Sequence, residues 1–331
     1  MRVTIKDIAK KVGVTPATVS MVINNSPKIS QETKEKVLKA IREMNYHPNY
    51  IGRSLVKGET NNIAVVASFF ASLFALESVR GIEINLRKTP YNLILYSTKG
   101  MDENEEDLLR RILYERRADG VIIISLKAKK ELMEEFRKEN VAAVFIEEIV
   151  EDFPTVKFNN IKAAYIATEH LIKNKRKNIG LIVGNKGLNA EERLRGYKEA
   201  LSHYNIDFDK DKVVEIVDYS FEDGEKALNT LMGKNKKIDA VFCAAGDITA
   251  IGFMDAAKEK GIIIPDDIAI IGFDDIYLAN LTTPGLTTIR QPITKMGMQA
   301  FDLLLDVIKG KEEDGKKIIS FEPELIIRES V

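Results

Sequence analysis

The chain has 331 residues, of which 45% are hydrophobic and 30% charged, and it contains one cysteine. This composition is typical of a globular protein of two or more domains, and a single cysteine excludes an internal disulfide. No run of about 18 apolar residues and no apolar stretch behind Arg2 and Lys6 is present, so the sequence predicts neither a membrane span nor a secretory signal. We expect a cytoplasmic protein in which Cys243, within an apolar run, is a buried and inert thiol.

Charge is distributed unevenly along the chain. The formal net charge is −1, but residues 1–60 carry eleven basic and five acidic side chains, a balance of +6 that leaves −7 for residues 61–331. A basic segment joined to an acidic body suits a polyanionic partner for that segment. A lysine-rich, solvated helical surface would have the same balance, so charge alone leaves both interpretations open.

Residues 1–46 are predicted to form three short helices. Thr4 caps the first, with Asp7 three residues later as in a capping box, and Gly13 ends it. Ser30 caps the third helix. The apolar positions expected to face inward from the third helix recur at helical spacing: Val37, Leu38, Ile41 and Met44.

The second helix begins after Thr15, with Pro16 in its first position, and ends near Asn24. Its outer face is small and almost uncharged, and a short turn joins it to the first helix. This arrangement is typical of a helix-turn-helix, whose second helix enters the DNA major groove, where hydroxyls meet phosphates and apolar groups meet thymine methyls. The residues of this head expected to contact DNA are Thr4, Thr15, Pro16, Ala17, Thr18, Ser20, Met21, Asn24 and Tyr46.

Residues 49–60 follow as a connecting segment. Residues 50–55 can form about two helical turns, which is too short for a stable isolated helix. Arg53 and Lys57 add positive charge, and Leu55 has no evident core to enter. The segment is therefore either an interdomain linker with an incidental leucine, or one of two paired helices that place a leucine between base steps of a minor groove.

Residues 4–55 closely resemble, without a gap, the DNA-binding head and hinge of LacI/GalR-type transcriptional repressors. The matching stretches read TIKDIAKKVGVTPATVSMVIN and ISQETKEKVLKAIREMNYHPNYIGRSL. The resemblance implies a homodimer on a pseudo-palindromic operator in the nucleoid. It also implies that Pro16, Ala17 and Met21 read bases and that Leu55 is the minor-groove lever.

Two residues of the head depart from the family pattern. Met21 stands where arginine or histidine is common, so we expect readout through methyl contacts and DNA deformability. Gly52 stands where alanine is usual, and glycine in a helix costs about 1 kcal/mol relative to alanine. We therefore expect a hinge that depends on DNA for its folding more than is usual.

From Asn62 onward, short apolar runs alternate with helical patterns such as 102–115 and 190–204. Buried strands alternating with helices predict parallel sheets covered on both faces, here two doubly wound α/β lobes with a ligand cleft at the strand carboxyl ends. The eight predicted strands are residues 63–68, 91–97, 120–125 and 141–147 in one set, and 178–184, 213–219, 240–245 and 268–273 in the other.

This part of the chain resembles the effector-binding core of the same family, itself related to periplasmic sugar-binding proteins. The matching pieces are GIEINLR (81–87), RRADGVII (116–123), ERLRGYKEAL (192–201), GIIIPDDIAIIGFDD (261–275) and LTTIRQPI (286–293). The resemblance thus covers nearly the whole chain. The predicted domains are a helix-turn-helix head (1–48), a hinge (49–60) and a core (61–331), with an N-lobe of about 61–160 and 292–321 and a C-lobe of about 161–291 and 322–331.

The resemblance carries a set of effector contacts onto the core. Arg193 matches an arginine that clamps ligand hydroxyls, and Asp274 matches a carboxylate that accepts from a sugar diol; together with aromatic walls they suit a polyhydroxylated ring. The alternative is a structural ion pair between these two residues across the cleft. The effector-binding residues that the resemblance implies are Phe69, Phe70, Glu147, Arg193, Tyr219, Gly246, Asp274 and Gln291.

Two cleft positions depart from the family. Gly246, followed by Asp247, stands where asparagine or a similar polar residue is usual, and Ser68 replaces a frequent aspartate. The missing side chain at Gly246 favours a roomier pocket and an oligosaccharide as the effector.

Enzyme motifs are weak in this sequence. No G-x-G-x-x-G is present, and residues 310–316, GKEEDGK, follow a helix and precede Lys317 in place of the serine or threonine of a P-loop. Asp274 and Asp275, adjacent on an extended stretch, are expected to point opposite ways, so that one has a surface or capping role. The three histidines, too scattered for a metal site or a triad, are His47, His170 and His203.

The sequence therefore predicts a repressor without cofactor, metal or membrane contact. A sugar-like effector would close the lobes, change the separation of the two hinges of a dimer and so control operator binding, with induction the commoner outcome in the family. No heptad tail precedes Val331, which favours a dimer over a coiled-coil tetramer. Two alternatives remain: a core that answers to a protein co-repressor or a non-sugar ligand, and an enzyme.

Overall fold

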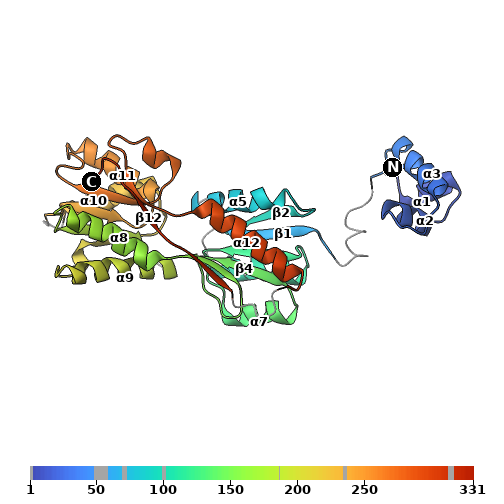
Figure 1. Cartoon of the computed structure of the whole chain (residues 1–331), viewed down its shortest axis with the longest axis horizontal. Helices are drawn as coiled ribbons and strands as arrows, with labels where there is room; N and C mark the ends of the chain where they lie inside the picture. Colours follow the sequence, from blue (N-terminus) through green and yellow to red (C-terminus); the bar gives the residue numbers. More distant parts are fainter. Residues whose placement is uncertain are drawn as a thin grey trace. The chain divides into compact units, whose positions relative to one another are not determined.

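The computed structural model describes residues 3–47, 59–68, 73–98, 102–185, 187–233, 237–311 and 317–331 (Figure 1). The chain divides into two compact units, Met1–Thr60 and Asn61–Val331. None of the helices in these ranges combines the length and apolar character that crossing a bilayer requires.

The first unit contains the three predicted helices, α1 (Ile5–Val12), α2 (Pro16–Ile23) and α3 (Gln31–Glu43). Their ends follow from local chemistry. The side chain of Thr15 accepts a hydrogen bond from the backbone of Thr18, and Gly13 ends α1 with a φ of 75°, which favours glycine. The capping residues and helix boundaries predicted for this unit are confirmed.

One predicted core position of the head is wrong. Leu38 is 42% exposed, whereas Val37 and Ala40 are buried. Positions three apart share a helix face, while the residue directly after Val37 is turned by about 100° around the helix axis. The buried residues of the head are Ile8, Ala9, Val19, Val22, Val37 and Ala40.

The N-lobe of the second unit has a six-stranded, fully parallel sheet in the order β11-β5-β4-β3-β1-β2. Its strands are β1 (Asn62–Ala67), β2 (Asn92–Ser97), β3 (Gly120–Ile124), β4 (Ala142–Ile146), β5 (Thr155–Phe158) and β11 (Ile318–Phe321). Helices α5 (Leu73–Leu86) and α12 (Ile293–Ile308) pack together on one face, and α6 (Asp102–Tyr114) and α7 (Lys130–Lys138) cover the other.

The C-lobe repeats this plan in a sheet of order β12-β10-β9-β8-β6-β7, in which only the β10–β12 pair is antiparallel. Its strands are β6 (Ile179–Gly184), β7 (Val213–Ile216), β8 (Ala240–Cys243), β9 (Ala269–Asp274), β10 (Thr287–Arg290) and β12 (Glu324–Ile326). Helices α8 (Asn160–Lys173) and α9 (Leu188–His203) cover one face, and α10 (Phe221–Gly233) and α11 (Asp247–Glu259) the other (Figure 1).

The two doubly wound α/β lobes are confirmed, but the expected eight strands are too few. The sequence missed β5, β10, β11 and β12, which have three or four residues each and include at least one polar residue, such as threonine, lysine, serine or glutamate, in place of a continuous apolar run. Short mixed strands leave no periodic signal, and pairing with longer neighbours stabilises them.

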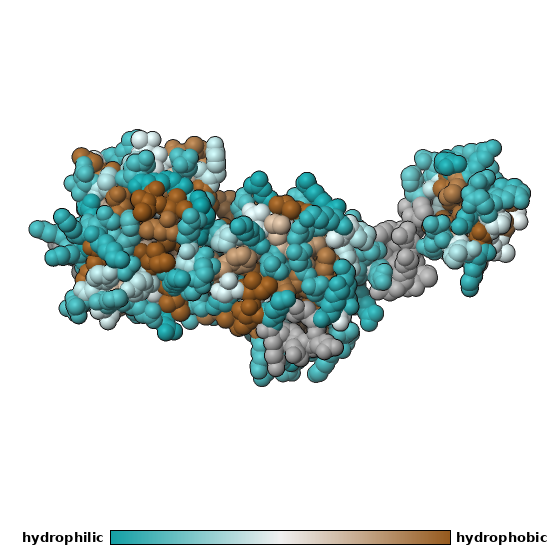
Figure 2. All heavy atoms as spheres, viewed as in Figure 1, coloured by the Kyte–Doolittle hydropathy of each residue, from teal (hydrophilic) through white to brown (hydrophobic). Residues whose placement is uncertain are grey.

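The chain passes between the lobes three times: after β5, after β10, and between β11 and β12. One buried apolar cluster includes residues of both lobes. Figure 2 shows one face of the molecule, on which hydrophilic residues dominate and hydrophobic groups gather on both lobes of the core. The crossovers matter for function because Asn160 and Gln291 lie at two of them.

Candidate functional site

Helix α2 has an inner and an outer face. Val19 and Val22 are buried in the core of the head, whereas Pro16, Ala17 and Met21 are exposed. The outer face therefore consists of short or flexible apolar side chains at the positive end of a helix. Such a surface can approach base edges and a phosphate closely.

Hydroxyl groups flank this outer face. The Thr15 and Thr18 hydroxyl oxygens lie 2.9 Å apart, so one donates to the other and one proton stays available for a phosphate oxygen. Thr4 donates its hydroxyl to Asp7 at 2.7 Å. Thr4 and Asn24 are exposed, and Ser20 and Tyr46 are partly buried. The hinge residues Arg53, Leu55 and Lys57 lie outside the described residues.

Arg193, on α9, is held on three sides in the core. Its Nε donates to Asn160 Oδ1 at 2.8 Å and its Nη1 donates to the Ala244 carbonyl at 2.7 Å, while its guanidinium carbon lies 3.7 Å from the centre of the Phe273 ring. Burial lowers the pKa of this arginine, an effect that Asp274 and then Glu147 oppose. In the described part of the chain Nη2 has no hydrogen-bond partner, so this end of the guanidinium can meet a ligand.

Asp274 ends β9 beside this arginine. The ion pairs of the described residues do not include Arg193–Asp274, so the alternative of a direct pair is wrong: Arg193 donates to Asn160 and Ala244, and Asp274 Oδ1 accepts from Gln291 Nε2 at 2.5 Å. Burial raises the pKa of Asp274 to about 6, against the opposing effect of Arg193. The carboxylate therefore lies close enough to the guanidinium for its pKa to be lowered by that charge. No described residue donates a hydrogen bond to Oδ2, so this oxygen can accept from a ligand.

Gln291 and Gly246 border Asp274. Gln291 is 5% exposed, and its buried Oε1 has no hydrogen-bond partner among the described residues. Gly246 has a φ of 127°, which favours glycine, and a Cβ there would lie 3.3 Å from Asp274 Oδ2. Backbone conformation alone thus explains the glycine.

Glu147 follows β4 and is 3% exposed. Its Oε1 accepts from the Phe158 backbone N–H at 2.6 Å and its Oε2 accepts from Asn160 Nδ2 at 3.0 Å. Burial raises its pKa from 4.5 to about 7, opposed by Asn160 and Arg193. Both oxygens of this predicted effector contact are therefore engaged within the protein.

The remaining predicted contacts are placed unevenly. Tyr219 has a φ of 55°, and its hydroxyl covers Gly184 so closely that any side chain at that position would collide with it. Ser68 lies at the end of β1, with its hydroxyl 3.0 Å from that of Thr98. Phe69 and Phe70 lie outside the described residues.

Asp275 corrects the expectation of a surface or capping role for one of the paired aspartates. Its carboxylate is bound by Arg290 at 2.7 Å and by Arg328 at 2.6 Å, and its side chain is only 8% exposed. Asp274 and Asp275 both have a positive φ, 110° and 57°, so the two residues are not extended and strand alternation does not govern their directions.

Sequence reasoning gave no role to Asn160 and Asp247. Asp247 is buried and accepts from the Thr288 hydroxyl at 2.6 Å and from the Ile276 N–H at 2.9 Å, which ties α11 to the loop that follows Asp274. Burial raises its pKa well above the ordinary value. The available signal was position, since Asn160 lies two residues after the end of β5 and Asp247 four residues after the end of β8, at the carboxyl ends of parallel strands.

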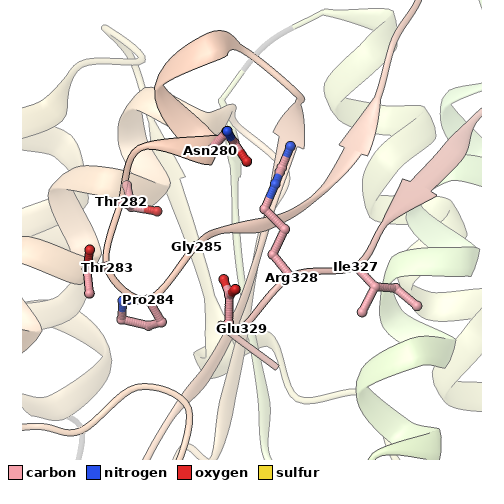
Figure 3. A pocket seen from close by; sticks show the side chains of 8 residues that line it. All are labelled: Asn280, Thr282, Thr283, Pro284, Gly285, Ile327, Arg328 and Glu329. Atoms are coloured by element: carbon pink, nitrogen blue, oxygen red, sulfur yellow. The ribbon is translucent and has the colours of Figure 1, made fainter.

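A hollow of about 600 Å³ lies elsewhere on the C-lobe (Figure 3). One loop and the C-terminal segment supply its walls, and its arginine, Arg328, already donates to the Leu286 carbonyl and to Asp275. None of the predicted effector residues among those described lines it. Its lining residues are Asn280, Thr282, Thr283, Pro284, Gly285, Ile327, Arg328 and Glu329.

Two observations concern possible metal ligands and the single thiol. In the described ranges, no three His, Cys, Asp or Glu side chains are grouped so as to hold a metal ion. Cys243 is buried as predicted, its Sγ lies 3.5 Å from the Gly246 carbonyl, and burial raises the pKa of its thiol.

The raised pKa of Glu147 predicts a pH-dependent stability. Between its ordinary value of 4.5 and about 7, the folded state holds a proton that the unfolded state releases. The contribution of this group to the free energy of unfolding is therefore largest below pH 4.5 and falls, by an amount on the order of 3 kcal/mol, as pH rises through about 7. We expect the Tm of Glu147→Gln relative to the unaltered chain to rise between about pH 5 and 8. A Tm difference independent of pH would contradict this.

Two parts of the chain match known families. Residues 4–49 match the bacterial regulatory proteins of the lacI family, and residues 168–331 match the periplasmic binding protein-like domain. The transcriptional repressor PurR of Vibrio campbellii (strain ATCC BAA-1116) is 35% identical over 332 residues, covering 99% of this chain and 98% of that protein. The transcriptional regulator RegA of Clostridium saccharobutylicum is 34% identical, covering 100% of this chain and 99% of its own.

Solved structures give the same result. A lac repressor dimer bound to operator and the anti-inducer ONPF superimposes with a TM-score of 0.87 at 25% identity, covering 100% of this chain and 99% of that one. A complex of the transcriptional regulator CelR with cellobiose has a TM-score of 0.74 at 29% identity and full coverage of both chains. The similarity therefore extends over both units of the molecule.

Proposed function

The chain belongs to the LacI family of transcriptional regulators, and from this we propose that a neutral, polyhydroxylated effector bound at Arg193, Asp274 and Gln291 controls its binding to operator DNA. The observation that carries the proposal is a set of hydrogen-bonding atoms at these three residues for which the described part of the chain supplies no partner. Arg193 Nη2 offers donors, whereas Asp274 Oδ2 and the buried Gln291 Oε1 offer acceptors. A diol can donate to the two acceptors while a third oxygen accepts from the guanidinium.

On the DNA side, we propose that the exposed face of α2 reads bases and that its hydroxyls bind phosphates. Pro16, Ala17 and Met21 are the proposed reading residues, and Leu55 the proposed minor-groove lever. The remaining proposed contacts are Thr4, Thr15, Thr18, Ser20, Asn24, Tyr46, Arg53 and Lys57. This activity on operator DNA would place the protein at the nucleoid, in the cytoplasm.

The proposed acting unit is a homodimer on a pseudo-palindrome. Exposed apolar side chains on the N-lobe support it, with Leu73, Leu76 and Ile84 on α5 and Leu95 on β2. The proposed domains remain a head (1–48), a hinge (49–60) and a core (61–331), whose N-lobe comprises about 61–160 and 292–321 and whose C-lobe comprises about 161–291 and 322–331. The effector would shift the lobe arrangement and with it the separation of two hinges, without being chemically changed.

The remaining proposed effector contacts are Phe69, Phe70, Glu147, Tyr219 and Gly246. Of these, Tyr219 offers a half-exposed ring for stacking on a sugar. A Cβ at Gly246 would lie 3.3 Å from Asp274 Oδ2, so the absence of a side chain keeps this oxygen accessible, and an oligosaccharide remains the proposed effector.

The charge of the site predicts which effectors it rejects. Above pH 7 the carboxyls of Glu147 and Asp274, with pKa values of about 7 and about 6, are both ionised around one guanidinium, so at pH 8 the phosphate of a phosphorylated sugar would meet a site of net negative charge. We expect cellobiose to change the affinity of the full chain for its operator, and cellobiose 6′-phosphate to require at least about 10-fold more ligand. Fluorescence anisotropy with an operator selected from random duplexes measures both. Tighter binding of the phosphate would contradict the proposed site, and no response to any neutral sugar would favour a protein co-repressor or a non-sugar ligand.

A further inference from the structure

We propose that Glu147 and Asn160 form a hydrogen-bonded relay that positions Arg193, so that the N-lobe sets the direction of an arginine on the C-lobe. The inference rests on the proposed function in one respect, namely that Arg193 binds an effector. It changes the role of Glu147 from an effector contact to a positioning residue that acts through Asn160.

The carboxylate is the fixed end of the relay. Glu147 lies directly after β4 of the N-lobe and is 3% exposed. One oxygen accepts from the Phe158 N–H at the end of β5, and the other accepts from Asn160 Nδ2. A buried carboxylate with both oxygens engaged by the protein is poorly placed to bind an effector but well placed to orient an amide.

The amide of Asn160 converts this contact into an orientation. Asn160 is 1% exposed and is the first residue of α8, where the chain crosses to the C-lobe. Because Nδ2 faces Glu147, Oδ1 must face the other way, and there it accepts from Arg193 Nε at 2.8 Å. Nδ2 also lies 3.4 Å from the Phe158 carbonyl and 3.3 Å from Asn189 Oδ1, two further acceptors that favour the same orientation.

The relay links the two lobes at the effector cleft. A movement of the β4 end relative to α9 stretches the Glu147–Asn160–Arg193 line and turns Nη2 away from Asp274 and Gln291. Glu192, which raises the pKa of Glu147, is itself bound by Lys157 at 3.1 Å. The three relay residues are therefore the contacts through which lobe arrangement and effector affinity affect each other.

The first test replaces the carboxylate. In Glu147→Gln, one carboxylate oxygen is replaced by an N–H₂ group, which is then placed against another donor, either the Phe158 N–H or the Asn160 Nδ2–H. If Asn160 flips to relieve this, its N–H₂ faces Arg193 Nε–H. We expect hydrogen exchange at Arg193 Nε–H, assigned with Arg193→Lys in ¹⁵N-labelled full-length protein, to accelerate at least about 10-fold. The matched control Glu148→Gln, a half-buried neighbour outside the relay, should change it less than about 2-fold.

The second test restores the relay with its polarity exchanged. In Glu147→Gln/Asn160→Asp, the glutamine accepts from Phe158 and donates to the new aspartate, which accepts from Arg193 Nε. Exchange should return to within about 3-fold of the unaltered chain, which a merely structural role would not produce. Unchanged exchange in Glu147→Gln, or a double variant that exchanges as fast as the single one, would overturn the relay.

If Glu147→Gln did not fold, Asn160→Ala would replace it, because it removes the link and keeps the carboxylate. Asn160→Ala must then accelerate hydrogen exchange at Arg193 Nε–H by at least about 10-fold, and exchange in Glu147→Gln/Asn160→Asp must be slower than in Asn160→Ala. All rates are measured without effector, so a failure of the relay is distinct from a failure of the sugar site, which the cellobiose titration tests.

Discussion

Ala17→Glu is expected to weaken operator binding by at least about 100-fold while leaving the head folded. Ala17 is exposed in the first turn of α2, where an acidic residue stabilises a helix through its dipole and no core contact is lost. On DNA the same carboxylate would face base edges and phosphates at close range. Stability and affinity should therefore change in opposite directions, which a general disruption of the head would not produce. Thermal unfolding and fluorescence anisotropy measure the two quantities.

The control for this variant is Lys39→Gln. It also lowers the net charge of the head by one unit, but on α3, where Lys39 only approaches Glu43 at 3.9 Å. We expect a loss of less than about 3-fold, because one distant charge has a small effect at ordinary salt. Equal losses in both variants would show that total charge, and not the face of α2, determines affinity.

The head could be predicted almost completely because its signals are local. Thr4, Thr15 and Ser30 begin helices through hydrogen bonds to residues three positions away, and Gly13 ends one through its own φ. Leu38 was misplaced because a run of two apolar residues does not say which one faces inward. That choice depends on the partner helices.

The core was predicted in class but not in detail. Long apolar runs such as β1 and β3 are recognisable alone, whereas β10 exists because β9 offers it a partner, and β12 because β10 does. The cleft shows the same limit. The positive φ of Asp275, and the partnership of Asn160 with residues 13 and 33 positions away, arise from tertiary packing that no local pattern encodes.

The resemblance to the family identified Arg193, Asp274 and Gln291, which the structure brings together, but it gave no means to separate effector contacts from their supports. The hydrogen bonds of each side chain distinguish effector contacts from the residues that support them. Gln291 has a buried acceptor that no described residue binds, whereas both oxygens of Glu147 accept hydrogen bonds from the protein. A buried group that lacks a hydrogen-bond partner in the protein is available to a ligand. A group whose hydrogen bonds are all made within the protein instead orients the residues that it binds.

Arg193→Lys is expected to weaken effector binding by at least about 100-fold and to change operator affinity without effector by less than about 3-fold. Lysine keeps the positive charge between Glu147 and Asp274, so neither buried carboxylate is left uncompensated. One ammonium cannot, however, reach Asn160, the Ala244 carbonyl and a ligand together.

Arg195→Lys is the matched control on the same helix, since Arg195 is exposed and bound to Glu199 at 2.7 Å. The effector for this test is the sugar of a panel that raises the Tm of the unaltered chain most. The affinity of each variant for operator is then measured by fluorescence anisotropy with and without this sugar. An exposed arginine on a salt bridge contributes little, so Arg195→Lys should respond to effector as the unaltered chain does. An effector response retained in Arg193→Lys would show that its guanidinium is only structural. The effector would then have to bind through other donors.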